Sequence, residues 1–212
     1  MPTLEDFLNS DQLRIWESLK TPMDIQAYLD VMPYSVDSFD RSPLRVMRDQ
    51  VAHCMDGGLL AAAALRRMGY LPRLIDIFPP PDTDDDHILA IFKRNGAYGC
   101  LAKSNFPGLR SRQPVYRSLR ELVMSYFEVF FSMDGSRCLR SYTAPLNLSQ
   151  FDHCEWELRD EAGPMIEARL ASLHQYPLLT PEMEADLPPM DPFSFKVFTI
   201  GVNPAGLYKP KM

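Results

Sequence analysis

Residues 53–75 of the chain read HCMDGGLLAAAALRRMGYLPRLI, and this stretch decides the fold. Its middle part, from Leu59 to Met68, consists almost entirely of strong helix formers. Gly69 is the residue type expected just beyond the C-terminus of a helix. The stretch therefore predicts a helix that carries Cys54 in its first turn.

A cysteine in the first turn of a helix is chemically distinctive. Backbone N–H groups there have no intrahelical partner, and the helix dipole favours negative charge. We therefore expect the Cys54 thiol to ionise more readily than a free thiol, and the thiolate is the nucleophilic form. Further along the chain, His87 follows an acidic run and begins an apolar segment. A thiol and an imidazole are the minimum parts of a cysteine-based acyl-transfer site.

The residues around the Ala-rich stretch predict three strands and several helices. Apolar residues predict strands over 70–78, 87–93 and 98–103, and Asn95-Gly96 predicts the hairpin turn between the last two because Asn-Gly readily takes positive φ. Upstream, the apolar spacing predicts helices over residues 4–19 with a break near 9–11, over 21–31, and over 42–51.

This middle segment resembles the transglutaminase-like superfamily over about residues 23–105, roughly half the chain. The resemblance is carried by Leu65-Arg66, Gly69, Pro72 and Arg73 at matching spacing between Cys54 and a strand-initial histidine. It implies an α+β fold with a papain-like core, in which a nucleophile-bearing helix packs on an antiparallel sheet.

The resemblance also implies residue roles. Cys54 would be the nucleophile, and His87 on the sheet would be its base. The family's third residue, an aspartate that orients the histidine, falls close to Ala102 in this chain. Ser104, two residues on, and Asn105 are the remaining candidates for this orienting role.

If these residues meet, His87 would take the thiol proton and Cys54 would attack an acyl carbon of a carboxamide, peptide or thioester. The Cys54 backbone N–H would bind the oxyanion, with the Gln50 side-chain amide as a candidate second donor. Water or an amine would then release the acyl group, so the chain would be a hydrolase or a transferase.

The ordinary structural interpretations stay open beside this one. Free cysteines are commonly small buried residues, and a histidine at a strand end can simply bond an aspartate. A domain of this fold without catalysis, serving as a binding or scaffolding module, is the alternative that the alanine at position 102 favours. The adjacent pair His153-Cys154 is expected to be core packing or chance, and Cys100 is expected to be core.

We expect residues 1–110 to form the core with its N-terminal helices, and residues 111–212 to form a mostly helical extension packed on it. Helices are predicted over 119–131, where aromatic residues gather, and within 158–174. The tail from residue 176 is rich in proline and is predicted to lie as an irregular strap over the surface.

Composition limits the classes of function. The net charge of −6 argues against a general nucleic-acid or anionic-membrane binder, and no stretch is apolar enough to span a membrane. The N-terminus lacks a secretory signal, and the four scattered cysteines do not suggest a disulfide framework. We therefore expect a cytoplasmic protein with a peptide or amide substrate and no cofactor. The aspartates around His53 and before His87 have no recognisable metal-ligand spacing, and Asp56-Gly57-Gly58 lacks the end of a phosphate-binding loop.

Overall fold

The computed structural model describes residues 2–209 and has an α+β architecture built on one antiparallel sheet. Over this range, every helix is too short or too polar to cross a bilayer. The elements run in chain order as η1 (Leu4–Phe7), α1 (Ser10–Ser18), α2 (Pro22–Val31), α3 (Pro43–Asp49), α4 (Cys54–Arg67), β1 (Arg73–Phe78), β2 (His87–Arg94), β3 (Ala97–Leu101), η2 (Pro107–Leu109), β4 (Arg112–Tyr116), α5 (Leu119–Met124), η3 (Phe127–Val129), β5 (Ser141–Thr143), β6 (Leu146–Asn147), η4 (Leu148–Cys154), α6 (Ala162–Ala171), β7 (Gln175–Pro177), α7 (Pro181–Ala185), α8 (Pro192–Phe198) and η5 (Pro204–Gly206).

The sheet has the strand order β4-β3-β2-β1-β5-β7, and β6 pairs with β1 beside β5. All pairings are antiparallel, and Asp76 of β1 lies opposite Ile88 of β2. The hairpin between β2 and β3 turns at Asn95 and Gly96, which both have positive φ as predicted. The start of β2 and the end of β3 therefore lie at the same edge of the sheet, close to the end of β1.

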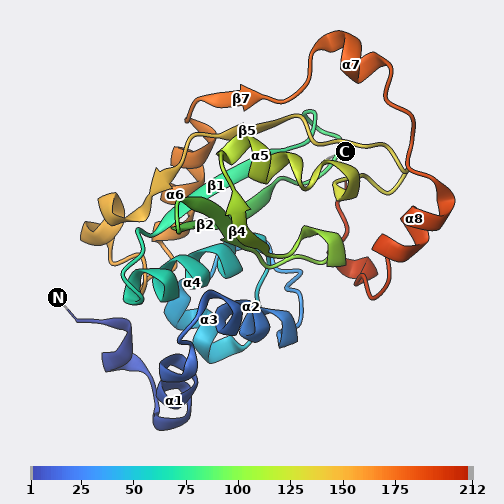
Figure 1. Cartoon of the computed structure of the whole chain (residues 1–212). Coiled ribbons are helices and arrows are strands. Elements are labelled where there is room, and N and C mark those ends of the chain that lie inside the picture. Colours follow the sequence, from blue (N-terminus) through green and yellow to red (C-terminus); the bar gives the residue numbers. More distant parts are fainter. Residues whose placement is uncertain (1, 210–212) are drawn as a thin grey trace.

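The N-terminal helices begin where their capping residues predict. Asn9 and Thr21 cap α1 and α2 through their side chains, and Pro22 occupies the first turn of α2. Figure 1 shows α1 to α4 gathered on one side of the sheet. The predicted break between the first two helical segments is confirmed, because η1 ends at Phe7 and α1 begins at Ser10.

Helix α4 lies unusually close to the sheet because its first turns contain two glycines. A Cβ atom on Gly57 would lie 2.2 Å from Cβ of Lys103, and one on Gly58 would lie 2.5 Å from Cγ2 of Ile88. From Met55 to Leu65 the helix is buried throughout. This close packing fixes the first turn of α4, and with it Cys54, against the beginning of β2.

A second apolar cluster covers the other face of the sheet. It contains Leu89 and Ile91 of β2 together with Cys100 and residues of α5. The expected core position of Cys100 is confirmed, since it has no exposed surface. The predicted helix over residues 119–131 is correct only to Met124, because the chain then bends through a 3-10 turn that directs its aromatic side chains into this cluster.

The C-terminal half is less helical than predicted. It contributes four strands, β4 to β7, to the same sheet, and β4 pairs directly with β3 across the expected boundary near residue 110. The sequence did not indicate β4 because this edge strand contains Pro114, three of its residues are half-buried, and two are exposed.

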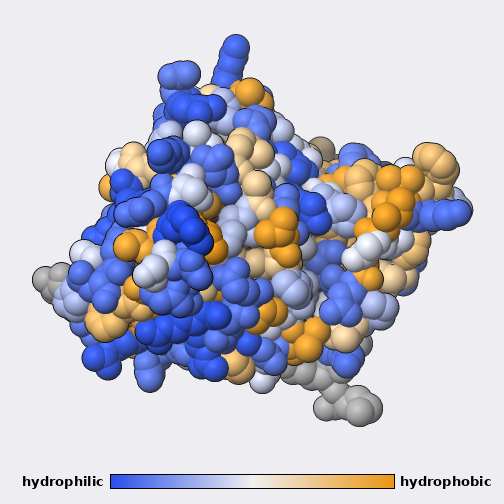
Figure 2. All heavy atoms as spheres, turned by 90° about the horizontal axis from the view of Figure 1, so that it is seen from below, coloured by the Kyte–Doolittle hydropathy of each residue, from blue (hydrophilic) through white to orange (hydrophobic). Residues whose placement is uncertain are grey.

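The tail combines short helices with extended segments. Figure 1 places α7 and α8 at the periphery, joined by long stretches without regular structure. Helix α8 exposes Phe193 and Val197, and Ile200 just after the helix is exposed as well. Figure 2 shows hydrophobic residues gathered on the projection on the right-hand side, where α8 lies in Figure 1. Its inner side packs on the body, with the ring centroids of Phe195 and Phe131 5.4 Å apart.

Candidate functional site

Cys54 is the first residue of α4, as predicted, and its thiol is half-buried. His53 precedes it with extended backbone and ends the loop that leads into the helix. The backbone N–H of His53 donates to Oδ2 of Asp56 over 3.0 Å, which closes the first turn. The backbone N–H of Cys54 lies at the helix start, where no intrahelical carbonyl is available to it.

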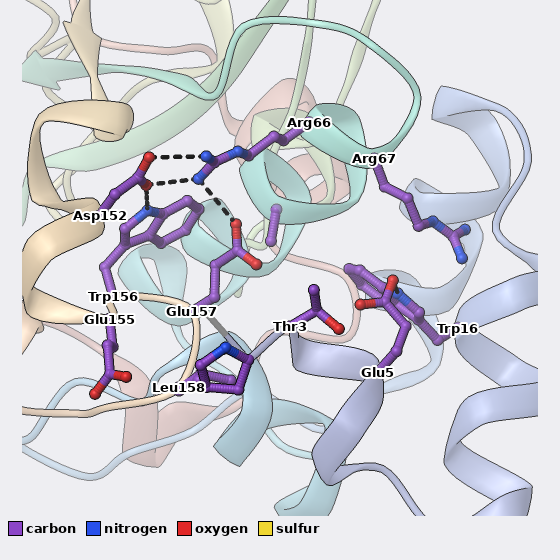
Figure 3. A pocket seen from close by; sticks show the side chains of 12 residues that line it. Thr3, Glu5, Trp16, Arg66, Arg67, Asp152, Glu155, Trp156, Glu157 and Leu158 are labelled. Carbon is purple, nitrogen blue, oxygen red and sulfur yellow. Dashed lines mark hydrogen bonds and ion pairs between the residues drawn. The ribbon is translucent and has the colours of Figure 1, made fainter.

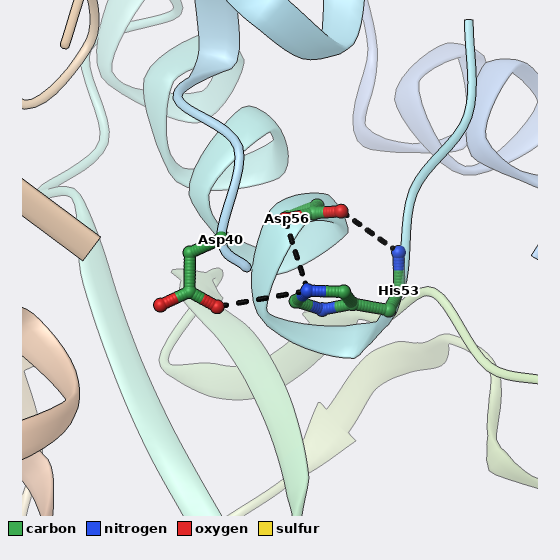
Figure 4. A group of neighbouring side chains, drawn as sticks. All are labelled: Asp40, His53 and Asp56. Atoms are coloured by element: carbon green, nitrogen blue, oxygen red, sulfur yellow. Dashed lines mark hydrogen bonds and ion pairs between the residues drawn. The ribbon is translucent and has the colours of Figure 1, made fainter. Parts of the chain in front are cut away.

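The start of α4 is held by a buried ionic network (Figure 4). Oδ1 of Asp56 accepts from the Arg41 backbone N–H at 2.6 Å, and Oδ2 lies 3.4 Å from the Arg41 guanidinium. The His53 ring lies between Asp56 and Asp40, with its Nε2 3.3 Å and 3.6 Å from their carboxylates. Asp40, His53 and Asp56 lie close enough to hold a metal ion. Both oxygens of Asp56 already have protein partners, so we interpret the group as an anchor for the helix start.

The Cys54 thiol faces carboxyl groups and a tyrosine. Burial raises its pKa well above the ordinary value, and the neighbouring Asp86 carboxylate raises it further, against a smaller lowering effect of the Ile88 backbone N–H. The expected readily ionised thiol is therefore wrong for this resting structure. The favourable helix start is outweighed by desolvation and by the neighbouring carboxylate.

Tyr34 completes the surroundings of the thiol. A β-bridge joins Tyr34 to Ala52, two residues before Cys54, and this places the phenol at the helix start. The Tyr34 hydroxyl lies beside both the backbone N–H and the thiol of Cys54, and burial raises its pKa. It is therefore a neutral hydrogen-bonding group next to the sulfur.

Asp76 and Asp86 form a carboxyl pair at the end of the sheet. Asp76 is buried at 3% exposure, and its Oδ1 has no hydrogen-bond partner within the described chain. Burial and the neighbouring Asp86 raise the pKa of Asp76, whereas a hydrogen bond from Asp76 partly offsets the effect of burial on Asp86. Asp76 thus carries the shared proton, and Asp86, which is less buried than Asp76, is the carboxylate.

His87 does not meet Cys54. Side chains of a strand alternate between faces, and Ile88 is the one that packs against α4. The His87 ring lies on the opposite face, where its Nε2 is 2.8 Å from the Leu109 carbonyl. Burial lowers its pKa to about 4, so the ring is neutral at ordinary pH. No hydrogen bond joins Cys54 and His87 in residues 2–209, and the expected direct contact between them is absent from this structure.

The other expected residues divide into two groups. Ser104 and Asn105 line a small cavity together with His87 and Tyr34 at the same edge of the sheet. Ser104 Oγ accepts from the Phe106 backbone N–H at 3.0 Å, and no hydrogen bond joins it to the His87 ring among the described residues. Ala102 is fully buried, and the position where the resemblance implies an aspartate holds only a methyl group.

Gln50 lies apart from this group. It is exposed and follows α3 with positive φ, and its side-chain amide donates to the Tyr28 hydroxyl at 2.5 Å and to the Met47 carbonyl at 2.7 Å. Because both contacts belong to helices α2 and α3, the expected role of Gln50 as an oxyanion donor has no support in its contacts.

Sequence reasoning missed Tyr34 and gave Asp76 no role. Tyr34 had no signal, since it lies in a turn-rich polar segment. Asp76 did have one, because it is a charged residue within the apolar run from Leu74 to Ile77, and a buried charge without a partner is costly.

A separate cavity of about 370 Å³ lies at the other end of α4 (Figure 3). It is lined by Arg66 and Trp156, and Arg66 is roughly 18 Å along the helix axis from Cys54. Its polar groups bond each other, because Arg66 donates to Asp152 at 2.6 and 2.8 Å and to Glu157 at 3.3 Å. The cavity is therefore distinct from the Cys54 site.

Comparison with known proteins identifies no family. No family model matches the chain, and no curated protein matches it. Among solved structures, it is similar to Legionella pneumophila LapG with a TM-score of 0.38 and 14% identity, over 49% of this chain and 74% of LapG. EGTA-treated LapG from the same organism gives a TM-score of 0.37 and 14% identity, over 49% and 71% of the two chains. Both scores lie below 0.5, so the site is interpreted below from this chain's own residues.

Proposed function

We propose that the chain is a thiol-dependent enzyme that acts on a peptide or amide bond through Cys54, by hydrolysis or by acyl transfer. The observation that supports this most directly is a partly buried cysteine at a helix start, with the Asp86 carboxyl close enough to raise the pKa of its thiol. A nucleophile, a proton acceptor and unpaired donors for an oxyanion are the parts that acyl transfer requires.

In the proposed mechanism, the Asp86 carboxylate takes the thiol proton as the sulfur attacks the carbonyl carbon. The negative charge that forms on the carbonyl oxygen is stabilised by the Cys54 backbone N–H and the Tyr34 hydroxyl. Asp86 then returns the proton to the leaving amine, and an acyl thioester remains on Cys54. Water or a second amine, deprotonated by Asp86, attacks the thioester and restores the thiol.

The raised pKa of Asp86 suits this role. A carboxylate with a higher pKa is a stronger base, which narrows the gap to the thiol that it must deprotonate. Asp76 supports Asp86 by keeping its own proton and donating a hydrogen bond through it, so that Asp86 stays ionised while Asp76 stays neutral. In this proposal Asp86 replaces His87 as the base, and the His87 ring holds the Leu109 carbonyl and the cavity wall in place.

The test is an amide-hydrolysis assay with a peptide library, combined with a thiol-directed probe and mass spectrometry of the labelled peptide. We expect Cys54→Ala to abolish turnover, and Asp86→Asn to lower it by about 10² to 10⁴-fold. Asp82→Asn and Cys154→Ala are matched controls, since Asp82 is an exposed acid of the same run that lines neither neighbouring cavity, and Cys154 is the other partly buried cysteine.

Two outcomes would contradict the proposal. If His87→Gln were inactive while Asp86→Asn kept its rate, the imidazole would be the base after all. If no peptide were cleaved or transferred although the chain bound peptides, the fold would serve as a binding module.

A further inference from the structure

The end of the chain crosses the site just described. We define the C-terminal strap as residues 199–209, which follow α8. Gly206 and Tyr208 of the strap line the small cavity that also contains Tyr34 and His87. Leu207 and Tyr208 line a neighbouring cavity of about 410 Å³.

The two cavities adjoin under the strap. Both are lined by Asp84, Phe106 and Tyr208, and the larger one continues to Arg137 and Arg140. The strap therefore lies over one hollow that runs from Tyr34, the neighbour of Cys54, to Arg137 and Arg140.

The Asn105 side chain bonds only backbone atoms of the strap. Its Nδ2 donates to the carbonyls of Asn203 at 2.9 Å and Gly206 at 3.1 Å, and its Oδ1 accepts from the Asn203 N–H at 2.8 Å. One side-chain amide thus pairs with three main-chain groups, which any polypeptide can offer.

Gly206 packs closely against the Tyr34 ring. A Cβ atom at position 206 would lie 2.9 Å from Cδ1 of Tyr34 and 3.1 Å from Nδ2 of Asn105. The Tyr34 hydroxyl lies beside the thiol and the backbone N–H of Cys54. The strap is therefore linked to the nucleophile through a single side chain.

We propose that the C-terminal strap occupies the substrate groove of this enzyme, and that the ligand which displaces it is a polypeptide segment that can form the same turn, with a glycine opposite Tyr34. Asn105 would form with the backbone of that segment the hydrogen bonds that it now forms with the strap. The carboxyl groups of Asp84, Asp85 and Asp86 line the same cavity, so the groove favours neutral or basic peptides over acidic ones. The inference rests on the proposed function for the chemistry at Cys54, whereas the binding of a peptide stands independently of turnover.

The test uses the full-length chain and measures two rates. Hydrogen exchange of the strap amides reports whether the strap is released, and alkylation by iodoacetamide at pH 8.5 reports access to Cys54. We expect Asn105→Ala and Gly206→Ala to accelerate both, with Cys54 alkylated about tenfold faster because three backbone hydrogen bonds or the glycine contact are lost. Cys154 in the same sample is the internal reference and should keep its rate.

Arg120→Ala is the matched control variant. Arg120 donates to the Leu178 carbonyl at 3.1 Å and lines neither cavity under the strap, so this change loosens the tail upstream of α7 without touching the contacts at Asn105. It should leave the alkylation rate of Cys54 unchanged. A synthetic peptide of residues 202–209, added to the Asn105→Ala and Gly206→Ala variants, should slow Cys54 alkylation in Gly206→Ala and do so less in Asn105→Ala.

The inference is overturned if the strap exchanges faster in both variants while Cys54 reacts at the wild-type rate. It is also overturned if neither variant releases the strap, since Asn105 and Gly206 would then not hold it. If the added peptide slows Cys54 alkylation but the chain hydrolyses no amide, the proposed chemistry is refuted and the proposed peptide-binding groove is retained.

Discussion

Lowering the pH from 7 to 5 should destabilise this protein through His87 by about 2 kcal/mol. Burial lowers the pKa of the folded-state ring to about 4, whereas the ordinary value is 6.5. Between these values the unfolded chain binds a proton that the folded chain does not, so stability falls as the pH falls. Each unit is worth about 1.4 kcal/mol, and the full loss below pH 4 is about 3 kcal/mol.

The assay is urea unfolding of the wild type and His87→Gln at several pH values from 7 to 4.5. Glutamine can still donate to the Leu109 carbonyl but does not titrate, so the variant should lose this part of the pH dependence. His153→Gln is the matched control because His153 is exposed, and it should keep the wild-type slope. NMR titration of the ring signals provides a direct check, since the His87 ring should remain neutral down to about pH 5.

The result that would refute this reasoning is a His87 ring that titrates at or above pH 6.5. A histidine paired with a thiolate would have a raised pKa, and its stabilising effect would be lost as the pH rose. Parallel stability curves for the wild type and His87→Gln would likewise show that the ring is not buried in neutral form.

Two further predictions concern the position of α4. Gly58→Ala should lower the free energy of unfolding by about 1–3 kcal/mol, because the new Cβ would collide with Ile88. The double variant with Ile88→Ala should lose about 1 kcal/mol less than the sum of the two single losses. Urea unfolding that finds the two losses additive within about 0.5 kcal/mol would refute the contact. Asp56→Asn should cost about 3 kcal/mol, because it breaks a fully buried pair with Arg41, whereas Asp37→Asn on the exposed side of the same guanidinium should cost less than about 1 kcal/mol. Equal losses for the two aspartates would show that burial does not decide the strength of this network.

Local signals in the sequence were enough for the frame of the site. The helix formers before Gly69 place α4, and Gly69 has the positive φ expected of its terminating role. The Asn95-Gly96 turn fixes the β2–β3 hairpin and its register. These elements depend on neighbours in the chain, which is why they could be predicted without an alignment.

The face on which His87 lies could not be predicted. A strand with one exposed face alternates polar and apolar residues, and the alternation reveals which side chains point inward. In β2 both faces are covered, so Ile88 and Ala90 on one face and Leu89 and Ile91 on the other are all apolar. A shift of one residue moves every side chain to the opposite face. The sequence could therefore predict that His87 begins β2, but not which face of the sheet its ring lies on.

The sequence predicted that the tail is irregular, but not that its end lies over the site. The reason bears on function. Its contacts with Asn105 join backbone groups 98 or more residues away, and such contacts do not depend on which side chains the strap carries. At the contact with Tyr34 the strap is constrained in residue type, because a Cβ on Gly206 would meet the ring. A groove that recognises main chain and one small residue accepts many sequences. It follows that the same groove, once free of the strap, should accept polypeptides in which only the residue opposite Tyr34 must be small.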